Sequence, residues 1–142
     1  MITGTDIVRE ARSWIGTPFR WQASVRGVGC DCKGLVYGVA RELQMPEACS
    51  LHARMADYRT VVDEKLLRQG IEANFVQIET PEAGDVLLLR LGRRVQHLAI
   101  YSGFGHMIHT YSGGPDRVVE SEMGRAWGNA LDSAWRWKSM AA

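Results

Sequence analysis

Three side chains in this sequence have the chemistry of a nucleophile and its base. Cys32 begins a run that is typical of a helix, His97 opens an apolar run that is typical of a strand, and His109 follows on the next such run. A thiolate is a strong nucleophile, and an imidazole in contact with it can take its proton. A second polar group can hold that imidazole in the accepting tautomer. We therefore expect a cysteine-nucleophile site in which one histidine is the base and the other orients it.

The position of Cys32 favours a lowered thiol pKa. At the start of a helix, unpaired backbone N–H groups and the macrodipole stabilise an anion. A histidine in contact adds an ion pair, and Lys33 is adjacent. Gly34 would leave room for a substrate backbone, and the backbone N–H of Cys32 would face a developing oxyanion. We expect a thiol that reacts well below pH 8, the range in which an ordinary thiol is mostly protonated.

Helices are expected in the first half of the chain. Thr3 or Thr5 can cap a first helix, which ends before Pro18. Residues 17–31 read as a loop. A second helix begins near Cys32 and stops at Pro46, and a third lies between about residues 54 and 69. The residues expected on the buried face of the first helix are Ile7, Ala11, Trp14 and Ile15.

The second half changes to short strands separated by glycine-containing turns. The expected strands are Val86–Leu91, His97–Ser102, His106–Tyr111 and Arg117–Ser121, with Trp135–Trp137 as a last edge strand. Helices followed by strands predict an α+β fold, in which helices cover one face of an antiparallel sheet of about five strands. The length of 142 residues suits a single domain over residues 1–142.

Composition and charge exclude several classes of function. A net charge of +1 without a Lys/Arg cluster gives no electrostatic basis for nucleic-acid binding. No apolar stretch is long enough to span a bilayer. The charged N-terminal residues contain no apolar segment of the kind found in signal peptides, so we expect none. Three cysteines are an odd number, which favours free thiols over a disulfide framework.

Five motifs, in this order and spacing, resemble those of the NlpC-type cell-wall peptidases over residues 5–122. They are Gly16-Thr17-Pro18-Phe19, Asp31-Cys32-Lys33-Gly34-Leu35-Val36, Gly84-Asp85-Val86, His97-Leu98-Ala99-Ile100-Tyr101 and Ile108-His109. Residues 22–30, before the cysteine, are similar to the branch of this family that phage tails and phage-derived gene transfer particles carry. The resemblance implies a papain-like fold.

The resemblance also implies an activity and a role for each residue. Its members hydrolyse a peptide bond in peptidoglycan stems, typically between D-glutamate and a diamino acid. By this correspondence Cys32 is the nucleophile, His97 the base and His109 the third polar residue, with no cofactor and no metal. The branch implies a protein made in the bacterial cytoplasm without a signal peptide. It would join other tail or baseplate proteins of a virion-like particle and act in the periplasm or cell wall.

Residues near the nucleophile predict how a stem peptide is held. Asp31 would either cap the helix or hold the amino end of the stem, and Lys33 would pair with a stem carboxylate. The chain departs from the family pattern twice, because Phe19 replaces the usual tyrosine and Lys33 a frequent serine. Trp21 or Gln22 would then supply the hydrogen bond of the missing tyrosine hydroxyl, and Trp21 would also touch glycan. The predicted substrate-binding residues are Phe19, Trp21, Gln22, Asp31 and Lys33.

Two other functions fit parts of the sequence. One is a zinc-binding module, although Cys-x-Cys is a poorer half-site than Cys-x-x-Cys and the spacing of the histidines is then unexplained. Its ligands would be Cys30, Cys32, Cys49 and His52. The other is a structural tail or baseplate component that has kept the fold and lost activity, since an intact set of catalytic residues is necessary and not sufficient. Elemental analysis tests the first, and thiol reactivity as a function of pH tests the second.

Overall fold

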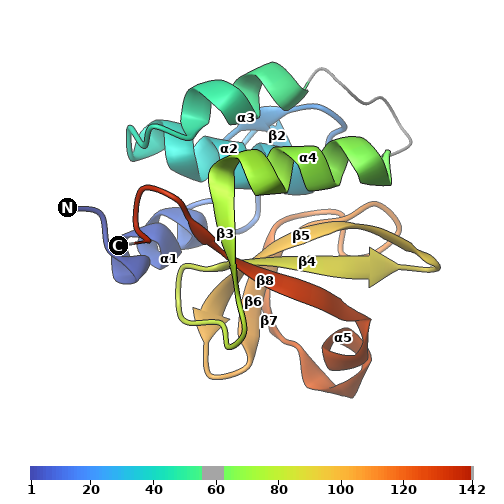
Figure 1. The fold of residues 1–142 in the computed structure, drawn as a ribbon. Coiled ribbons are helices and arrows are strands. Elements are labelled where there is room, and N and C mark those ends of the chain that lie inside the picture. The colour runs from blue at the N-terminus through green and yellow to red at the C-terminus, as the bar shows by residue number, and fades with distance from the viewer. Residues whose placement is uncertain (56–62, 142) are drawn as a thin grey trace.

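The computed structural model of the chain describes residues 1–55 and 63–141. In chain order the elements are α1 (Gly4–Arg12), β1 (Ser24–Val25), β2 (Gly29–Cys30), α2 (Cys32–Glu42), α3 (Ala48–Met55), α4 (Glu64–Asn74), β3 (Phe75–Ile78), β4 (Val86–Leu91), β5 (Arg94–Gly103), β6 (His106–His109), β7 (Val119–Glu122), α5 (Gly124–Ala130) and β8 (Leu131–Trp137). Helices α2, α3 and α4 cover one side of the sheet, and α5 lies on the other (Figure 1). The predicted α+β class is confirmed, but the helices do not all lie on one face.

Helix α1 follows its sequence pattern except at its end. The Thr3 hydroxyl accepts a hydrogen bond from the backbone N–H of Asp6, whose carboxylate accepts from the Thr3 N–H in return. The fully buried residues of this segment are Ile7, Ala11 and Trp14. The prediction that Ile15 is also buried is wrong, since 47 % of it is exposed. The helix ends at Arg12, so helical spacing no longer directs the side chain of Ile15.

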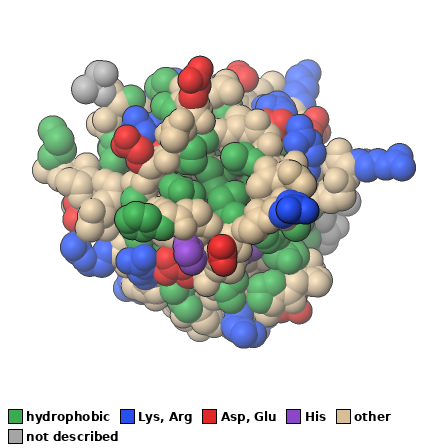
Figure 2. All heavy atoms as spheres, turned by 90° about the horizontal axis from the view of Figure 1, so that it is seen from below, with side chains coloured by type: hydrophobic (Ala, Val, Ile, Leu, Met, Phe, Trp, Pro, Cys, Tyr) green, Lys and Arg blue, Asp and Glu red, His purple; other side chains and the backbone are tan. Residues whose placement is uncertain are grey.

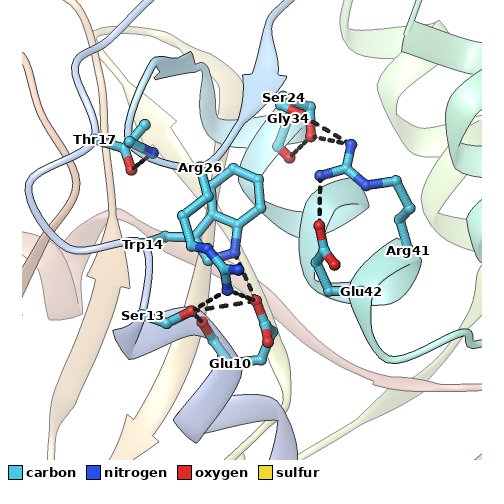
Figure 3. A network of polar contacts seen from close by, with 10 residues as sticks. Glu10, Ser13, Trp14, Thr17, Ser24, Arg26, Gly34, Arg41 and Glu42 are labelled. Atoms are coloured by element: carbon cyan, nitrogen blue, oxygen red, sulfur yellow. Dashed lines mark hydrogen bonds and ion pairs between the residues drawn. The ribbon is translucent and has the colours of Figure 1, made fainter.

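Residues 17–31, predicted as a loop, contain the two-stranded antiparallel hairpin β1–β2. An ion pair and hydrogen bonds connect this hairpin to α1 and to α2 (Figure 3). Arg26 lies 3.0 Å from the carboxylate of Glu10 in α1, and Arg41 of α2 donates to the carbonyl of Ser24 at 2.8 Å. The segment that leads into the start of α2 is therefore held from two directions.

Helix α2 begins and ends close to its predicted bounds, and the next helical segment does not. The buried apolar stripe of α2 is Leu35, Val36, Val39 and Ala40. The single helix predicted over residues 54–69 overlaps the end of α3 and the start of α4, while residues 56–62 lie outside the described residues. Asp63 caps α4 by accepting from the backbone N–H groups of Lys65 and Leu66, so a helix begins inside the predicted range.

The main sheet has six strands in the order β3-β8-β4-β5-β6-β7, and each neighbouring pair is antiparallel. Consecutive hairpins form the run from β4 to β7, as predicted. The prediction that Trp135–Trp137 is an edge strand is wrong, because β8 lies between β3 and β4. Trp135 is opposite Gln77 on one side and Val86 on the other. β3 forms the edge instead, and no sequence signal separates it from the preceding helix.

The alternation of side chains along the strands divides the core into two parts. Leu98, Ile100 and Ile108 pack toward the helices in the larger cluster, which also contains Cys32. Ala99 and Met107 belong to a smaller cluster on the opposite face of the sheet. Figure 2, seen from below, shows hydrophobic side chains in the middle of this face and charged side chains mostly around them. No helix among the described residues is long and apolar enough to span a membrane.

Candidate active site

Cys32 is the first residue of α2, and the turn before it is fixed by Asp31. One Asp31 oxygen accepts from the backbone N–H of Gly34 and the other from that of Gln22, both at 2.7 Å. Asp31 is 1 % exposed, so this cap is buried. Of the two roles considered for Asp31, capping is the one these bonds carry out. The cap places the thiol at a helix N-terminus that is joined to the hairpin.

Burial controls the resting charge of this thiol. Desolvation raises the pKa of Cys32 to about 12, and the nearby charge of Asp31 acts in the same direction. Hydrogen bonding from the backbone of Leu98 and the charge of Lys33 lower it by less. The predicted lowering of the pKa is therefore wrong for the resting state, because loss of solvent outweighs the helix N-terminus. A proton acceptor is needed when the thiol reacts.

Gly34 is required for packing against the hairpin. A Cβ at this position would collide with the carbonyl oxygen of Ala23. The hydroxyl of Ser24 also donates to the Gly34 carbonyl at 2.6 Å. The expectation that Gly34 leaves room for a substrate backbone is wrong, because the hairpin occupies that space.

His97 and His109 are brought together by the pairing of β5 with β6. Nε2 of His97 lies 2.9 Å from Nδ1 of His109, and Nε2 of His109 lies 3.1 Å from Oγ of Ser121 in β7. Both rings are buried. Nδ1 of His97 has no hydrogen-bond partner among the described residues. The His97 ring is thus hydrogen-bonded through one nitrogen, and its other nitrogen is buried and unpaired among the described residues.

The hydrogen bonds that join His97, His109 and Ser121 can fix the tautomer of both imidazole rings. For Nδ1 of His97 to accept a proton, its Nε2–H must donate to Nδ1 of His109, whose own Nε2–H then donates to Ser121. Burial, and secondarily the neighbouring His109, hold the pKa of His97 well below its usual value. Burial also lowers the pKa of His109 to about 4. Both rings are therefore neutral near pH 7, as this tautomer requires.

Two aromatic rings pack against both histidines. The Trp127 ring of α5 lies 5.4 Å from His97 and 5.3 Å from His109, measured between ring centroids. Tyr111 lies 5.4 and 5.7 Å from the same two rings. These contacts exclude water from the histidine pair and restrict the orientation of each ring.

A cavity of about 210 Å³ connects the thiol with the first histidine. This space exceeds what a single water molecule needs and can take a short section of a bound molecule. Cys32 and His97 both line it, together with residues from the segment before α2, from β4 and β5 and from the chain after β6. These are Phe19, Trp21, Asp31, Leu91, Gln96, Thr110, Tyr111 and Ser112. A carbonyl group in this cavity could be attacked by the thiol while the unpaired imidazole nitrogen takes the proton.

The predicted residues divide into those that share this cavity and those that do not. Asp31, Phe19 and Trp21 line it, and the last two are in edge contact with ring centroids 5.0 Å apart. Gln22 is not among the lining residues, although its backbone N–H reaches Asp31. Lys33 lines a separate apolar cavity of about 20 Å³ between α2 and α4. Contact between Lys33 and a substrate remains a prediction.

The described residues give no support to the zinc-binding alternative. They contain no group of three or more His, Cys, Asp or Glu side chains placed to hold a metal ion. Cys30 is fully buried in the larger core cluster, whereas Cys49 is exposed on α3 and His52 packs against the ring of Tyr37. Within the described residues, the four side chains suggested as ligands are therefore not gathered at one metal site.

Several residues at the site were not predicted from the sequence. Ser121 lies two positions along β7 from Val119, which is directly opposite His109, so only the strand register brings it to the histidine. Trp127 belongs to α5, a helix without a side-chain cap or a buried residue. Thr110 lines the cavity and directly follows His109, and this adjacency was the one sequence feature that could have indicated it as a site residue.

Comparisons of the sequence and the fold with known proteins show which family the chain resembles. The NlpC/P60 family model matches residues 16–136. The NlpC/p60 domain of the peptidoglycan hydrolase SagA is 25% identical, with a TM-score of 0.63 and coverage of 95% of this chain and 99% of that domain. The peptidoglycan hydrolase RipB of Mycobacterium tuberculosis is 20% identical, with a TM-score of 0.59 and coverage of 94% and 63%.

A third solved structure, an NLP/P60 family protein of Staphylococcus aureus similar to a lipoprotein, is 21% identical, with a TM-score of 0.62 and coverage of 94% and 40%. The chain therefore spans less than two thirds of the length of RipB and of the S. aureus protein. No curated protein matches the sequence. The family model covers most of the chain, and the SagA domain matches it over nearly the full length of both. This chain belongs to the NlpC/P60 family.

Proposed function

We propose that this chain is a cysteine peptidase that hydrolyses a peptide bond in the stems of bacterial peptidoglycan. The observation that carries the proposal is that Cys32 and His97 line the same cavity. Nε2 of His97 is hydrogen-bonded to Nδ1 of His109, which leaves Nδ1 of His97 for the thiol proton. Family membership and the two neighbours named peptidoglycan hydrolases support the choice of substrate.

In the proposed reaction the Cys32 sulfur attacks the carbonyl carbon of the scissile amide. Nδ1 of His97 takes the thiol proton and later gives it to the leaving amine. Thiolate and imidazolium, each unfavourable alone in this buried cavity, stabilise each other when they form together. The backbone N–H of Cys32 donates to the oxyanion, since a first-turn N–H has no partner within its helix. Water then hydrolyses the thioester and frees the enzyme.

We further propose that the bond cleaved joins D-glutamate to a diamino acid. This rests on the resemblance of the five sequence motifs. The same resemblance, through residues 22–30, supports a setting in a phage tail or gene transfer particle that delivers the enzyme to the cell wall. Within such a particle the chain would contact other tail or baseplate proteins.

One observation favours the alternative of a structural tail component without activity. Burial holds the pKa of Cys32 high and that of His97 low, so the pair is neutral at rest. In an enzyme, substrate binding would have to favour transfer of the proton from Cys32 to His97, whereas a structural component has no such requirement.

Digestion of purified sacculi tests the proposal and the alternative together. Wild type is expected to release stem fragments whose masses, measured by mass spectrometry, identify the bond cleaved. Cys32→Ala is the matched control and should release none. Intact sacculi after incubation with folded wild type would favour the structural role. Efficient cleavage of casein with no release from sacculi would contradict the cell-wall substrate.

A further inference from the structure

Thr110 carries a buried hydroxyl that has no partner within the described part of the chain. Its side chain is 0 % exposed, and Oγ1 makes no hydrogen bond there. Buried hydroxyl groups in native proteins are nearly always hydrogen-bonded, so an exception calls for a physical reason. Here the exception lies at the candidate active site, because Thr110 lines the same cavity as Cys32 and His97.

Thr110 lies on the side of the nucleophile. Met107 belongs to the cluster on the far face of the sheet and Ile108 to the cluster that faces the helices. Thr110 follows the last residue of β6, and the cavity that it lines together with Cys32 places it on the side of α2, as Ile108 is. His109 alternates to the other side, where it meets Ser121. Thr110 and His109 are therefore adjacent residues with different surroundings.

The polar groups that line the cavity differ in burial and in whether they can donate a hydrogen bond. Nδ1 of His97 is the proton acceptor in the proposed reaction, and both oxygens of Asp31 already accept from backbone N–H groups. Phe19, on the same cavity, carries no polar atom. Trp21 also lines the cavity, but it is 41% exposed and water competes for any hydrogen bond that it makes. Gln96, Tyr111 and Ser112 also line the cavity with groups that can donate, but Gln96 and Tyr111 are partly exposed and Ser112 is exposed. Of these donors, Thr110 alone is fully buried.

We propose that Thr110 is a substrate-binding residue, whose hydroxyl donates a hydrogen bond to a carbonyl oxygen of the peptide in the cavity. The inference rests on the proposed peptidase function. A site with a buried polar group discriminates strongly against molecules that leave the group unpaired. Thr110 thus favours a substrate whose backbone presents a carbonyl oxygen at this point, and disfavours an apolar group of the same size.

The test compares Thr110→Val, which replaces the hydroxyl by a methyl group of similar volume, with Thr110→Ser, which retains it. Thr110→Val is expected to lower kcat/KM for a stem peptide by roughly ten- to a hundredfold, whereas Thr110→Ser stays within about threefold of wild type. Ser102→Ala is the control, because Ser102 lines a different cavity beside Arg9 and Arg12. It is expected to leave kcat/KM unchanged.

Two further measurements separate substrate binding from packing. The Tm of Thr110→Val should equal or exceed that of wild type, since an unpaired buried hydroxyl is removed. Its rate of alkylation by iodoacetamide should match wild type, because the thiol is unaffected. Wild-type kcat/KM in Thr110→Val overturns the inference and leaves the peptidase standing. A lower Tm with equal losses in both Thr110 variants also overturns it, in favour of packing. Failure of wild type to cleave any stem peptide instead overturns the proposed function, and with it this inference.

Discussion

The two nitrogens of His97 lie in contrasting regions of the molecule. On the Nε2 side the protein supplies a continuous set of hydrogen bonds, since Nδ1 of His109 lies at 2.9 Å and Oγ of Ser121 lies 3.1 Å from Nε2 of His109. The Trp127 ring packs against both imidazole rings. On the Nδ1 side the ring nitrogen is unpaired and a cavity begins. The unpaired hydroxyl of Thr110 lines that cavity too.

The difference shows how one residue is both fixed and available. Contacts on the Nε2 side determine where the ring lies and which tautomer it adopts, so no binding free energy of a substrate is needed for that. Unpaired polar atoms on the Nδ1 side are unfavourable in the resting protein, and native structures retain them mainly where function requires them. We therefore expect substitutions on the cavity side to affect the reaction and those on the far side to affect orientation and protonation.

The largest effect is expected for the nucleophile. Cys32→Ala should lower kcat for stem peptides by at least about a thousandfold, because the bond-forming sulfur is lost. Cys30→Ala is the matched control, since Cys30 is buried two residues away in the core and its pKa is raised to about 12, mainly by burial. It should retain most of the activity after correction for the folded fraction. Loss of activity in Cys30→Ala with full activity in Cys32→Ala would reverse the assignment.

His97→Ala should be nearly as damaging as Cys32→Ala. The thiol has a high pKa and needs an acceptor for its proton, so neither residue works without the other. The double variant should therefore be no slower than the worse single variant, since the losses are not additive within one catalytic unit. Steady-state kinetics of the two single variants and the double variant provide the test. Additive losses would mean that His97 acts independently of the thiol.

His109→Ala should cost less, roughly ten- to a hundredfold in kcat/KM, because the base remains and only its orientation is lost. His109→Gln should recover part of the rate, since its side-chain oxygen can accept from Nε2–H of His97. The matched control is His106→Ala, on the same strand but exposed. A silent His109→Ala with an inactive His106→Ala would contradict the register of β6.

The buried histidines should also make stability depend on pH. Their pKa values lie below the ordinary value of 6.5, at about 4 for His109, so the unfolded chain binds protons that the folded chain does not. Stability is therefore complete above pH 6.5 and decreases as the pH falls toward 4, by about 1.4 kcal/mol per pH unit for each group. The free energy of unfolding, measured with urea at several pH values between 6 and 4.5, should decrease less steeply with falling pH in His109→Gln than in wild type. His106→Gln should match wild type, and equal slopes in all three would exclude this linkage.

Local sequence patterns predicted the elements whose ends are marked by glycine or by a helix-capping residue. Val86–Leu91 forms β4 as expected, because an apolar run lies between Gly84 and Gly92, both at positive φ. The start of α2 follows from the capping residue Asp31. β3 was missed because it follows α4 directly, without a glycine or proline between them. The inner position of β8 depends on pairing with distant strands, which a short local pattern does not contain.

The same distinction applies to the site. Cys32, His97 and His109 could be proposed because residue type, helix start and hairpin spacing are local features. Two other properties depend on the assembled molecule, namely the burial that raises the pKa of Cys32 and the strand register that brings Ser121 to His109. The cavity that Lys33 lines also depends on how α2, α3 and α4 come together, and single-sequence periodicity did not determine it.

The smallest effect is expected for Ser121, a positioning residue that does not line the cavity. Ser121→Ala removes the acceptor of the His109 Nε2–H, and one neutral hydrogen bond corresponds to roughly a fivefold change in kcat/KM. Without that acceptor the imidazolium form of His97 is less stabilised through His109, so the acid limb of the kcat/KM profile should move to lower pH, by less than about one unit. Ser121→Thr retains a hydroxyl on a strand and should restore both the rate and the limb. A loss in Ser121→Ala that Thr does not restore, with an unmoved acid limb, would mean that Ser121 packs against the histidine without setting its tautomer.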